Sequence, residues 1–435
     1  MGKVFSGVWP LMLGILLIML GNGLHFTLIG VRGGLEGFST TALAIVTSGY
    51  FIGFLSGARL TPLLIRNVGH VRVFAALGSF MSAALIAFPL LIEPISWTFL
   101  RILIGFCMSG IYVTAESWLN NAATNETRGK VLSAYMIMQT LGLIGAQGLL
   151  TLGDETTSTL FIGASIMVSL AFAPILLAAT PVPAAEITRA MSLRQLFTRA
   201  PLSTIGIFLL GGIYATQTGM GAVFGGQIGM SAAQVALFVA ALFTGALVFQ
   251  FPIGWVSDRV DRRWLVFSCA LAGLVFCLGG WVAQEVQWGL LAAAFLAGAV
   301  TTPLYALFLA HANDWLAQDE MSAASGGLVF TFGLGAILGP LATGWAMADF
   351  GPFAFWLVMS ATFSVIALYA LWRMTRRAGT PAEETESYVA VLPSTSAVVV
   401  QAAVEWSAEQ ADNEREAEAE RALSELDGDQ TQGTR

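Results

Sequence analysis

The sequence predicts an all-α membrane protein with about twelve transmembrane helices, arranged as two six-helix bundles related by a pseudo-twofold axis. Three observations predict this fold: the composition, a series of long apolar runs, and a similarity between the two halves of the chain. Hydrophobic residues make up 56% of the 435 residues. Charged residues make up only 11%, whereas soluble domains are about one quarter charged. A soluble protein must cover its surface with polar groups, so this chain is expected to have lipid as its solvent.

The apolar runs are long enough to be membrane spans, since a helix needs about 20 mostly apolar residues to cross a bilayer. In the first half they lie at 8–31, 40–64, 72–92, 97–120, 130–152 and 158–180. In the second half they lie at 203–224, 231–256, 264–284, 288–312, 322–347 and 352–373. The first run extends past the usual length of a secretory signal and is followed by many similar runs. It is therefore expected to be the first span.

The basic residues predict the orientation, because Lys and Arg are retained on the cytoplasmic side of a membrane. With the N-terminus inside, only Arg32 and Arg101 of the 20 basic residues fall within the membrane or outside it. We therefore expect a multi-pass protein of the bacterial inner (plasma) membrane with its N- and C-termini in the cytoplasm.

The domain organisation follows from the two sets of six spans. Residues 1–180 are expected to form an N-terminal six-helix bundle, and residues 203–373 a C-terminal six-helix bundle. The segment 181–202 is the expected cytoplasmic linker. Its basic stretch predicts a short amphipathic helix capped by Ser192.

The C-terminal residues 374–435 differ from the rest of the chain. From Arg376 onward the sequence has 13 acidic residues and five Arg. Low hydrophobicity and net negative charge predict an acidic, disordered cytoplasmic tail. Within it, 398–400 and Trp406 are the candidate anchors to another surface.

The two halves match when one is shifted along the other by 193 positions. The shift superimposes Gly105 on Gly298, Tyr112 on Tyr305, and Arg66 on Arg259. Several matches in one register favour a duplicated six-helix unit, and parallel repeats of this kind suit a protein that rocks one half against the other.

The loop after the eighth predicted span concentrates charged residues in the stretch Gly254-Trp-Val-Ser-Asp258-Arg259-Val-Asp261-Arg262-Arg263. An Asp at the end of one helix can meet an Arg and the N-terminus of a neighbouring helix, which makes a charge-assisted latch. The alternative is a cluster of basic residues that only keeps the loop in the cytoplasm.

This stretch resembles the GxxxDRxGRR signature of the major facilitator superfamily, with Asp261 in place of the usual Gly. The resemblance covers residues 1 to about 373. The corresponding loop of the first half departs from the pattern, with Ile65 in place of the Asp before Arg66. The runs 115–120 and 68–72 are most similar to the YcaD-like branch. The resemblance implies a secondary transporter with a cytoplasmic gate formed by Gly254, Asp258, Arg259, Arg262, Arg263 and Arg66.

Charged residues inside the spans are candidates for the solute and proton pathway, because a charge at the bilayer centre costs about 2.5–3.5 kcal/mol on insertion scales. Glu116 is the candidate proton-binding site, and its alternative role is a pair with a loop Arg near the inner interface. Arg101 can hold a solute carboxylate or tune a nearby acid, or else extend toward the outer headgroups. His25, with Asn22 one turn earlier, can face the cavity and titrate, or be a satisfied contact between helices.

Uncharged polar residues complete the candidate pathway. Tyr112 and Tyr305 occupy matching positions of the repeat, and they either line the cavity or serve in aromatic packing. The weaker candidates for solute contact are Gln139, Gln217, Gln250 and His311.

These observations together predict secondary active, proton-linked transport of a small organic solute by alternating access. Lys3 and Lys130 are the only lysines, and neither lies in a phosphate-binding GxxxxGK[ST] loop. No enzymatic activity, cofactor, metal or nucleic acid is expected. The expected partners are the solute, protons and the lipid bilayer, and the expected state is a monomer. Two alternatives are a non-transporting membrane sensor or scaffold that signals through its tail, and a permease subunit of an ATP-driven system.

Overall fold

The computed structural model describes residues 2–122, 125–178, 191–284, 286–316, 318–376, 388–393, 395–402 and 406, and all regular elements within them are helices. The first half forms α1 (Gly2–Leu35), α2 (Thr40–Val68), α3 (His70–Ala87), η1 (Phe88–Leu90), α4 (Pro94–Ala122), α5 (Asn125–Leu150) and α6 (Thr159–Ala178). The second half forms α7 (Leu193–Arg199), α8 (Pro201–Ala215), η2 (Thr216–Met220), α9 (Gly221–Gln227), α10 (Ala232–Ser257), α11 (Arg262–Val282), α12 (Gln287–Asn313), α13 (Gln318–Phe350) and α14 (Ala354–Arg376).

The helices confirm the predicted membrane architecture. Within the described residues, eleven helical stretches are long and apolar enough to cross a membrane. The predicted span 130–152 corresponds to α5, which has 26 residues but is less apolar and lies between α1 and α10. Its polar side chains Gln139, Thr140 and Gln147 are buried against other helices. A helix that contacts protein on several sides needs less hydrophobic surface than one that faces lipid, which explains its weaker signal.

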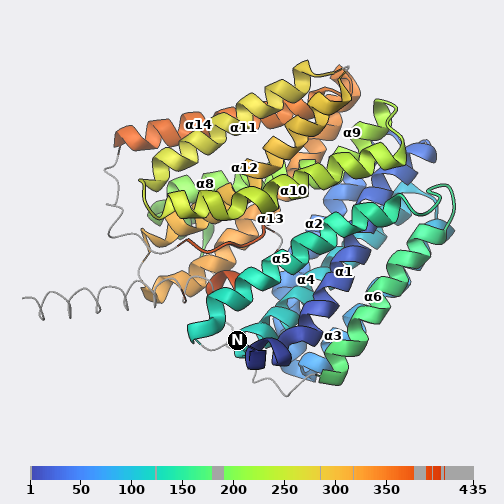
Figure 1. The fold of residues 1–435 in the computed structure, drawn as a ribbon, viewed down its shortest axis with the longest axis horizontal. Coiled ribbons are helices and arrows are strands. Elements are labelled where there is room, and N and C mark those ends of the chain that lie inside the picture. Colours follow the sequence, from blue (N-terminus) through green and yellow to red (C-terminus); the bar gives the residue numbers. More distant parts are fainter. Residues whose placement is uncertain are drawn as a thin grey trace, which may run out of the picture.

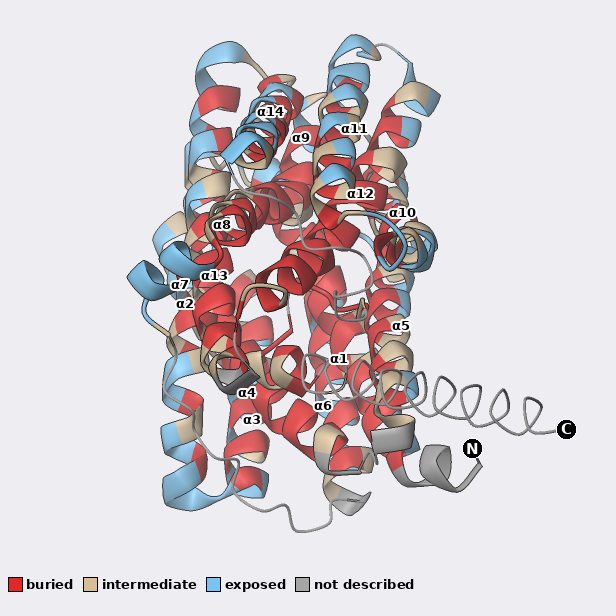
Figure 2. Ribbon diagram, turned by 90° about the vertical axis from the view of Figure 1, so that its left-hand side faces the viewer, coloured by how far each residue is buried: buried red, intermediate tan, exposed pale blue. Residues whose placement is uncertain are grey.

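The two halves are distinct groups of helices in which several helix pairs pack in the same way. Figure 1 shows α1–α6, in blue to green, on one side and α8–α14, in yellow-green to orange, on the other. The helix α2 packs on α4 as α10 packs on α12, and α1 packs on α5 as α8 packs on α13. Figure 2 shows that residues facing the interior are mostly buried, whereas the outer faces of the helices carry the exposed ones.

Matching glycines allow the closest of these contacts. A Cβ atom on Gly105 of α4 would lie 1.9 Å from the carbonyl oxygen of Tyr50 on α2. In the second half, a Cβ on Gly298 of α12 would lie 1.9 Å from the carbonyl oxygen of Leu242 on α10. These are the two glycines that the 193-residue shift superimposes, so the sequence repeat corresponds to a repeated helix–helix contact.

The α10–α11 loop and the ends of α2 and α14 mark one end of the molecule, which we call the basic end because Arg66, Arg259, Arg262, Arg263 and Arg376 lie there. The other end is called the opposite end. Near the opposite end the two halves meet directly, as Gly30 of α1 contacts Ala222 of α9 and Gly344 of α13 contacts Ala44 of α2. Small residues at these positions let the helices approach closely.

A short helix capped by Ser192 was predicted within the expected linker, and it is present as α7. Ser192 caps α7 with a capping box, in which its hydroxyl accepts from the backbone N–H of Gln195 and the Gln195 side chain accepts from the Ser192 N–H. Residues 181–190 of the predicted linker lie outside the described residues.

The expectation of a solvated tail is wrong for residues 388–393 and 395–402, which are packed against the helical body. Val391, Val399 and Val400 are at most 3% exposed and belong to the hydrophobic core. These apolar residues are clustered within a tail that is otherwise polar. The prediction used the mean composition of the whole tail, which does not show a short apolar segment that can pack against the helices. The Glu- and Ala-rich stretch at 405–425 lies outside the described residues, except for Trp406.

Candidate functional site

A cavity lies between the two halves and is lined by both. The space between its lining atoms, open space included, is about 570 Å³. The first half contributes residues of α1, α2, α4 and α5, and the second half contributes residues of α8, η2, α10 and α13. The lining residues are Asn22, Gly23, Phe26, Thr27, Tyr50, Phe51, Phe54, Tyr112, Leu143, Tyr214, Thr218, Val239, Phe243 and Phe332.

The wall of the cavity is mainly aromatic. Eight of the fourteen lining residues are Phe or Tyr. The rings of Phe26 and Tyr50 meet edge to face with their centroids 4.8 Å apart. The few polar groups include Asn22, whose side-chain oxygen is buried and has no hydrogen-bond partner among the described residues. The cavity therefore offers ring faces for stacking and isolated polar atoms for orientation.

Arg101 lies directly behind this aromatic wall. Its guanidinium stacks over the ring of Phe26 at 4.0 Å and over the ring of Tyr50 at 4.8 Å. The residue is 1% exposed, which rules out the alternative in which its side chain extends toward the outer headgroups. Among the described residues it forms no ion pair with a carboxylate, so its positive charge acts on the cavity through the two rings.

His25 does not line the cavity. Its Nδ1 lies 3.3 Å from a guanidinium nitrogen of Arg101, and its ring packs edge to face against Phe88 and Phe161. The structure therefore favours the alternative in which His25 is a buried contact between helices. Asn22, one turn earlier, does line the cavity, as does Tyr112.

Glu116 is buried near the basic end of α4 and is fully enclosed by protein. The hydroxyl of Tyr135 on α5 donates to its Oε1 at 2.7 Å. Ser396, from the tail, donates to its Oε2 through its backbone N–H at 3.0 Å and through its hydroxyl. No described Arg or Lys pairs with it, so the alternative of a pair with a loop Arg is not what the structure shows.

Three of the weaker candidates are buried side chains within the bundle. Gln217, in the π-helical segment η2, donates to the hydroxyl of Thr301 at 3.0 Å. Gln139 on α5 and Gln250 on α10 are fully buried, and neither side-chain amide has a hydrogen-bond partner among the described residues. Unpaired buried amides are costly, and a passing solute or water can satisfy them.

The remaining candidates differ in their surroundings. Tyr305 of α12 is behind the cavity wall, where its ring packs on that of Phe332, and its hydroxyl has no partner among the described residues. His311 is not among the residues that line the cavity, and it lines a separate pocket at the basic end with Arg199, Arg263 and Arg373.

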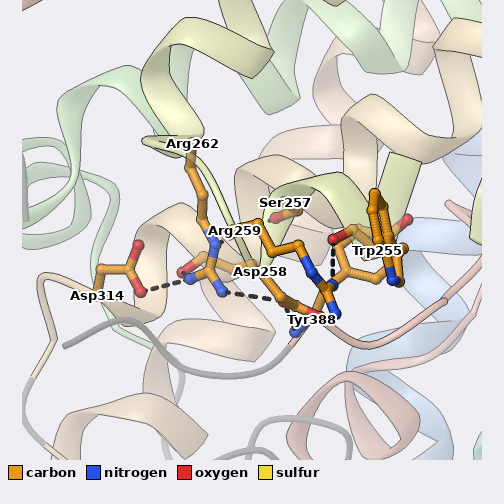
Figure 3. Close-up of polar contacts among 8 residues, drawn as sticks. Trp255, Ser257, Asp258, Arg259, Arg262, Asp314 and Tyr388 are labelled. Atoms are coloured by element: carbon orange, nitrogen blue, oxygen red, sulfur yellow. Dashed lines mark hydrogen bonds and ion pairs between the residues drawn. The ribbon is translucent and has the colours of Figure 1, made fainter. Parts of the chain in front are cut away.

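The charged motif at the basic end is centred on Arg262 (Figure 3). Its guanidinium forms an ion pair with Asp314 at the end of α12 at 2.5 Å and donates to the carbonyl oxygen of Ala310 at 3.3 Å. It also lies 3.8 Å from Asp258, at the end of α10. The motif thus ties α10, α11 and α12 together within the second half.

Other residues of the predicted gate have more peripheral positions. Arg259 stacks on Trp255 at 4.1 Å and donates to its carbonyl oxygen at 2.8 Å. Arg263 forms an ion pair with Asp261, which also caps α11. Arg66 is exposed at the end of α2. Gly254 of α10 is buried under the ring of Tyr388.

Asp258 links the motif to the tail. Its Oδ1 accepts the backbone N–H of Tyr388 at 2.8 Å (Figure 3). Burial raises the pKa of Asp258, and the Tyr388 N–H and the Arg262 charge oppose this shift. The carboxylate therefore lies between the helical body and the tail.

Most of the aromatic wall and the contact of Ser396 with Glu116 were not predicted from the sequence. The missed wall residues include Phe26, Tyr50, Phe54 and Tyr214. Tyr50 and Phe54 are four residues apart and so lie on one helix face, which was the available signal. For Ser396 the signal was its place beside the apolar run 397–400, in a tail that is otherwise rich in charge.

Comparisons with known proteins agree with this architecture. Residues 202–411 match the family model described as Major Facilitator Superfamily. The chain is 27% identical over 380 residues to a protein of Escherichia fergusonii named uncharacterized MFS-type transporter YcaD, covering 86% of this chain and 97% of that protein. The Escherichia coli K12 protein of the same name is also 27% identical, over 84% of this chain and 95% of its own length.

Solved structures with the same fold include the nucleoside transporter NupG, with a TM-score of 0.70, 15% identity and coverage of 85% of this chain and 99% of that one. A bacterial homologue of the human lysosomal transporter Spinster, in an inward-facing and occupied conformation, gives a TM-score of 0.67 at 16% identity over 84% of this chain and 96% of that one. The motif, the duplicated bundles and the relatives agree: the chain is similar in sequence and in fold to membrane transporters of the major facilitator superfamily.

Proposed function

We propose that the chain is a secondary active transporter of a small aromatic solute and works by alternating access around the central cavity. The observation that carries the proposal is the aromatic wall built by both halves. A solute bound there contacts both bundles, so its binding can be coupled to their rocking. Ring–ring contacts are worth about 0.5–1.5 kcal/mol each beyond the burial of area, which favours planar aromatic solutes over aliphatic ones of equal size.

We further propose that the basic end faces the cytoplasm of a bacterial cell and that protons drive transport through Glu116. The orientation rests on the retention of Arg and Lys on the cytoplasmic side. The coupling role rests on the burial of Glu116 without a paired cation among the described residues. Such a carboxylate can take up and release a proton as its surroundings change between states.

The solute class can be tested by thermal unfolding of the purified protein, since a ligand stabilises the state it binds. We expect aromatic solutes to raise Tm and aliphatic solutes of the same size to leave it unchanged. Phe54→Ala should remove the shift, whereas Phe99→Ala, which changes a lipid-facing ring that is 68% exposed, should retain it. Equal shifts with both classes of solute would contradict an aromatic site.

A non-transporting sensor that signals through its tail is the second candidate, because residues 388–393 and 395–402 pack against the helical body. The two are separated by deletion of residues 376–435 from protein reconstituted in liposomes. A transporter keeps solute flux after the deletion, whereas a protein whose only output is its tail has no flux in either form.

A further inference from the structure

The chain's own C-terminal segment, residues 388–393 and 395–402, here called the plug segment, lies at the basic end of the molecule. The surfaces of α4, α5 and α10 that it covers are here called the groove. The plug segment makes contacts with both halves. On the first half it reaches Glu116 of α4 and Met136 of α5, and on the second half it reaches Gly254 and Asp258 of α10. Figure 1 shows the corresponding orange-red trace between the two groups of helices.

The polar contacts of the plug segment are specific. Its first described residue, Tyr388, donates its backbone N–H to Asp258 at 2.8 Å. Further along, Ser396 donates its N–H at 3.0 Å and its hydroxyl to Glu116. Both acceptors are carboxylates, one on each half, so the segment bridges the two bundles with charge-assisted hydrogen bonds.

The apolar contacts are equally close. The ring of Tyr388 lies so near Gly254 that a Cβ there would be 2.4 Å from it. Ala390 and Leu392 form a small cluster with Met136, which is only 2% exposed. Beyond the plug segment in the chain, the ring of Trp406 covers Gly129 at the start of α5. The groove therefore has a pocket for a ring, an apolar patch and two acceptor carboxylates.

We propose that the plug segment is an autoinhibitory ligand of this groove, which closes the basic end and must leave before solute can pass there. The two halves meet directly near the opposite end, and α2 also meets α13 where Arg59 stacks over the ring of Phe330 at 4.4 Å. At the basic end the plug segment lies between α4 and α5 of one half and α10 of the other. It also holds Glu116, the carboxylate proposed to carry protons. Departure of the segment would open the path and free this carboxylate in one step.

The test uses labelling of a cysteine that the plug segment covers, so it needs no knowledge of the solute. The native Cys107, Cys269 and Cys277 are first replaced by Ala, and Met136→Cys is introduced in the full chain. A membrane-impermeant maleimide is then applied from the basic side in inverted vesicles. Met81→Cys is the matched control, because Met81 is fully buried in α3 away from the plug segment.

We expect Met136→Cys to react slowly in the full chain and at least about tenfold faster after deletion of residues 377–435, because labelling tracks the open population. Ser396→Asp in the full chain should have the same effect, since it places a second carboxylate against Glu116. Adding Glu116→Gln to Ser396→Asp removes the repulsion and should restore protection. The Met81→Cys control should stay unreactive in every form.

Equal labelling of Met136→Cys before and after the deletion would overturn the proposal, whether both forms are protected or both are reactive. If the deletion unfolds the protein, the Met81→Cys control will react, and the full-length Ser396→Asp variant then decides the question. A synthetic peptide of residues 388–402 should restore protection to the deleted form, and the same peptide with Ser396→Asp should not. The inference rests on the proposed function only for its effect on flux, so a failure of solute transport leaves the labelling result interpretable.

Discussion

Arg262 shows how a single side chain holds the basic end of the second half together. Its guanidinium is 1% exposed and contacts Asp314, whose side chain is 2% exposed. A buried ion pair is not a large net source of stability, but loss of one partner leaves the other charge buried without compensation.

Arg262→Ala is therefore expected to destabilise the protein by about 3–5 kcal/mol, which would appear as a clear fall in Tm of the purified protein. The control is Arg259→Ala in the same loop, whose exposed side chain stacks on Trp255 and is worth at most about 1 kcal/mol. Similar losses from both variants would show that the motif acts only as a cluster of positive charge.

Glu116 is the residue on which proton coupling depends in our proposal. Tyr135 on α5 donates its hydroxyl directly to this carboxylate, and no described cation pairs with it. Glu116→Gln keeps the shape and most hydrogen bonds of the side chain but cannot exchange a proton.

We expect Glu116→Gln to abolish the dependence of solute flux on an imposed pH gradient while leaving Tm within a few degrees of the parent. Glu93→Gln, at an exposed position before α4, is the control and should retain the pH dependence. Unchanged coupling in Glu116→Gln would remove this residue from the proton pathway.

At the scale of helices, the contact between α2 and α4 depends on the absence of a side chain at Gly105. Since a Cβ would lie 1.9 Å from a backbone oxygen of Tyr50, Gly105→Ala must push the two helices apart. The expected cost is about 1–3 kcal/mol, measured as a fall in Tm. Gly279→Ala on α11 is the control, because a Cβ there meets no atom within 4 Å and should improve helix stability by up to about 1 kcal/mol. A neutral Gly105→Ala would mean that α2 and α4 can separate freely.

The helices themselves were largely predictable, because hydrophobicity over about 20 residues is a strong local signal. The predicted spans 40–64 and 231–256 correspond closely to α2 and α10. The weakest agreement is at α5, where buried Gln139 and Gln147 lower the apolar character of a helix that packs between others.

The site was less predictable, because it depends on which helix faces meet. The candidates Asn22 and Tyr112 do line the cavity. His25 is only three residues from Asn22, but its side chain contacts Arg101 and does not line the cavity. Long-range contacts such as Ser396 with Glu116, 280 residues apart, leave no local periodicity in the sequence.

At the scale of the whole molecule, Asp258 lies where the gate motif and the plug segment meet. Asp258→Asn removes its negative charge but keeps an oxygen that can accept the Tyr388 N–H. We expect this variant to shift the protein toward the state open at the basic end, seen as faster labelling of Met136→Cys from that side. Asp261→Asn, which affects the α11 cap and its pair with Arg263, should not change labelling. Identical labelling of the two variants would mean that Asp258 does not help to close the basic end, and that the charged loop only sets the orientation of the protein in the membrane.

The covalent attachment of the plug segment to α14 has a consequence for how any competitor can act. A tethered segment binds as if it were present at an effective concentration in the millimolar range, whatever the amount of protein in the membrane. A soluble partner that captures the tail must therefore match this local concentration or hold the tail outside the groove with comparable strength. A change in the length or compactness of the residues between α14 and Tyr388 would alter occupancy of the groove with no change to any contact within it.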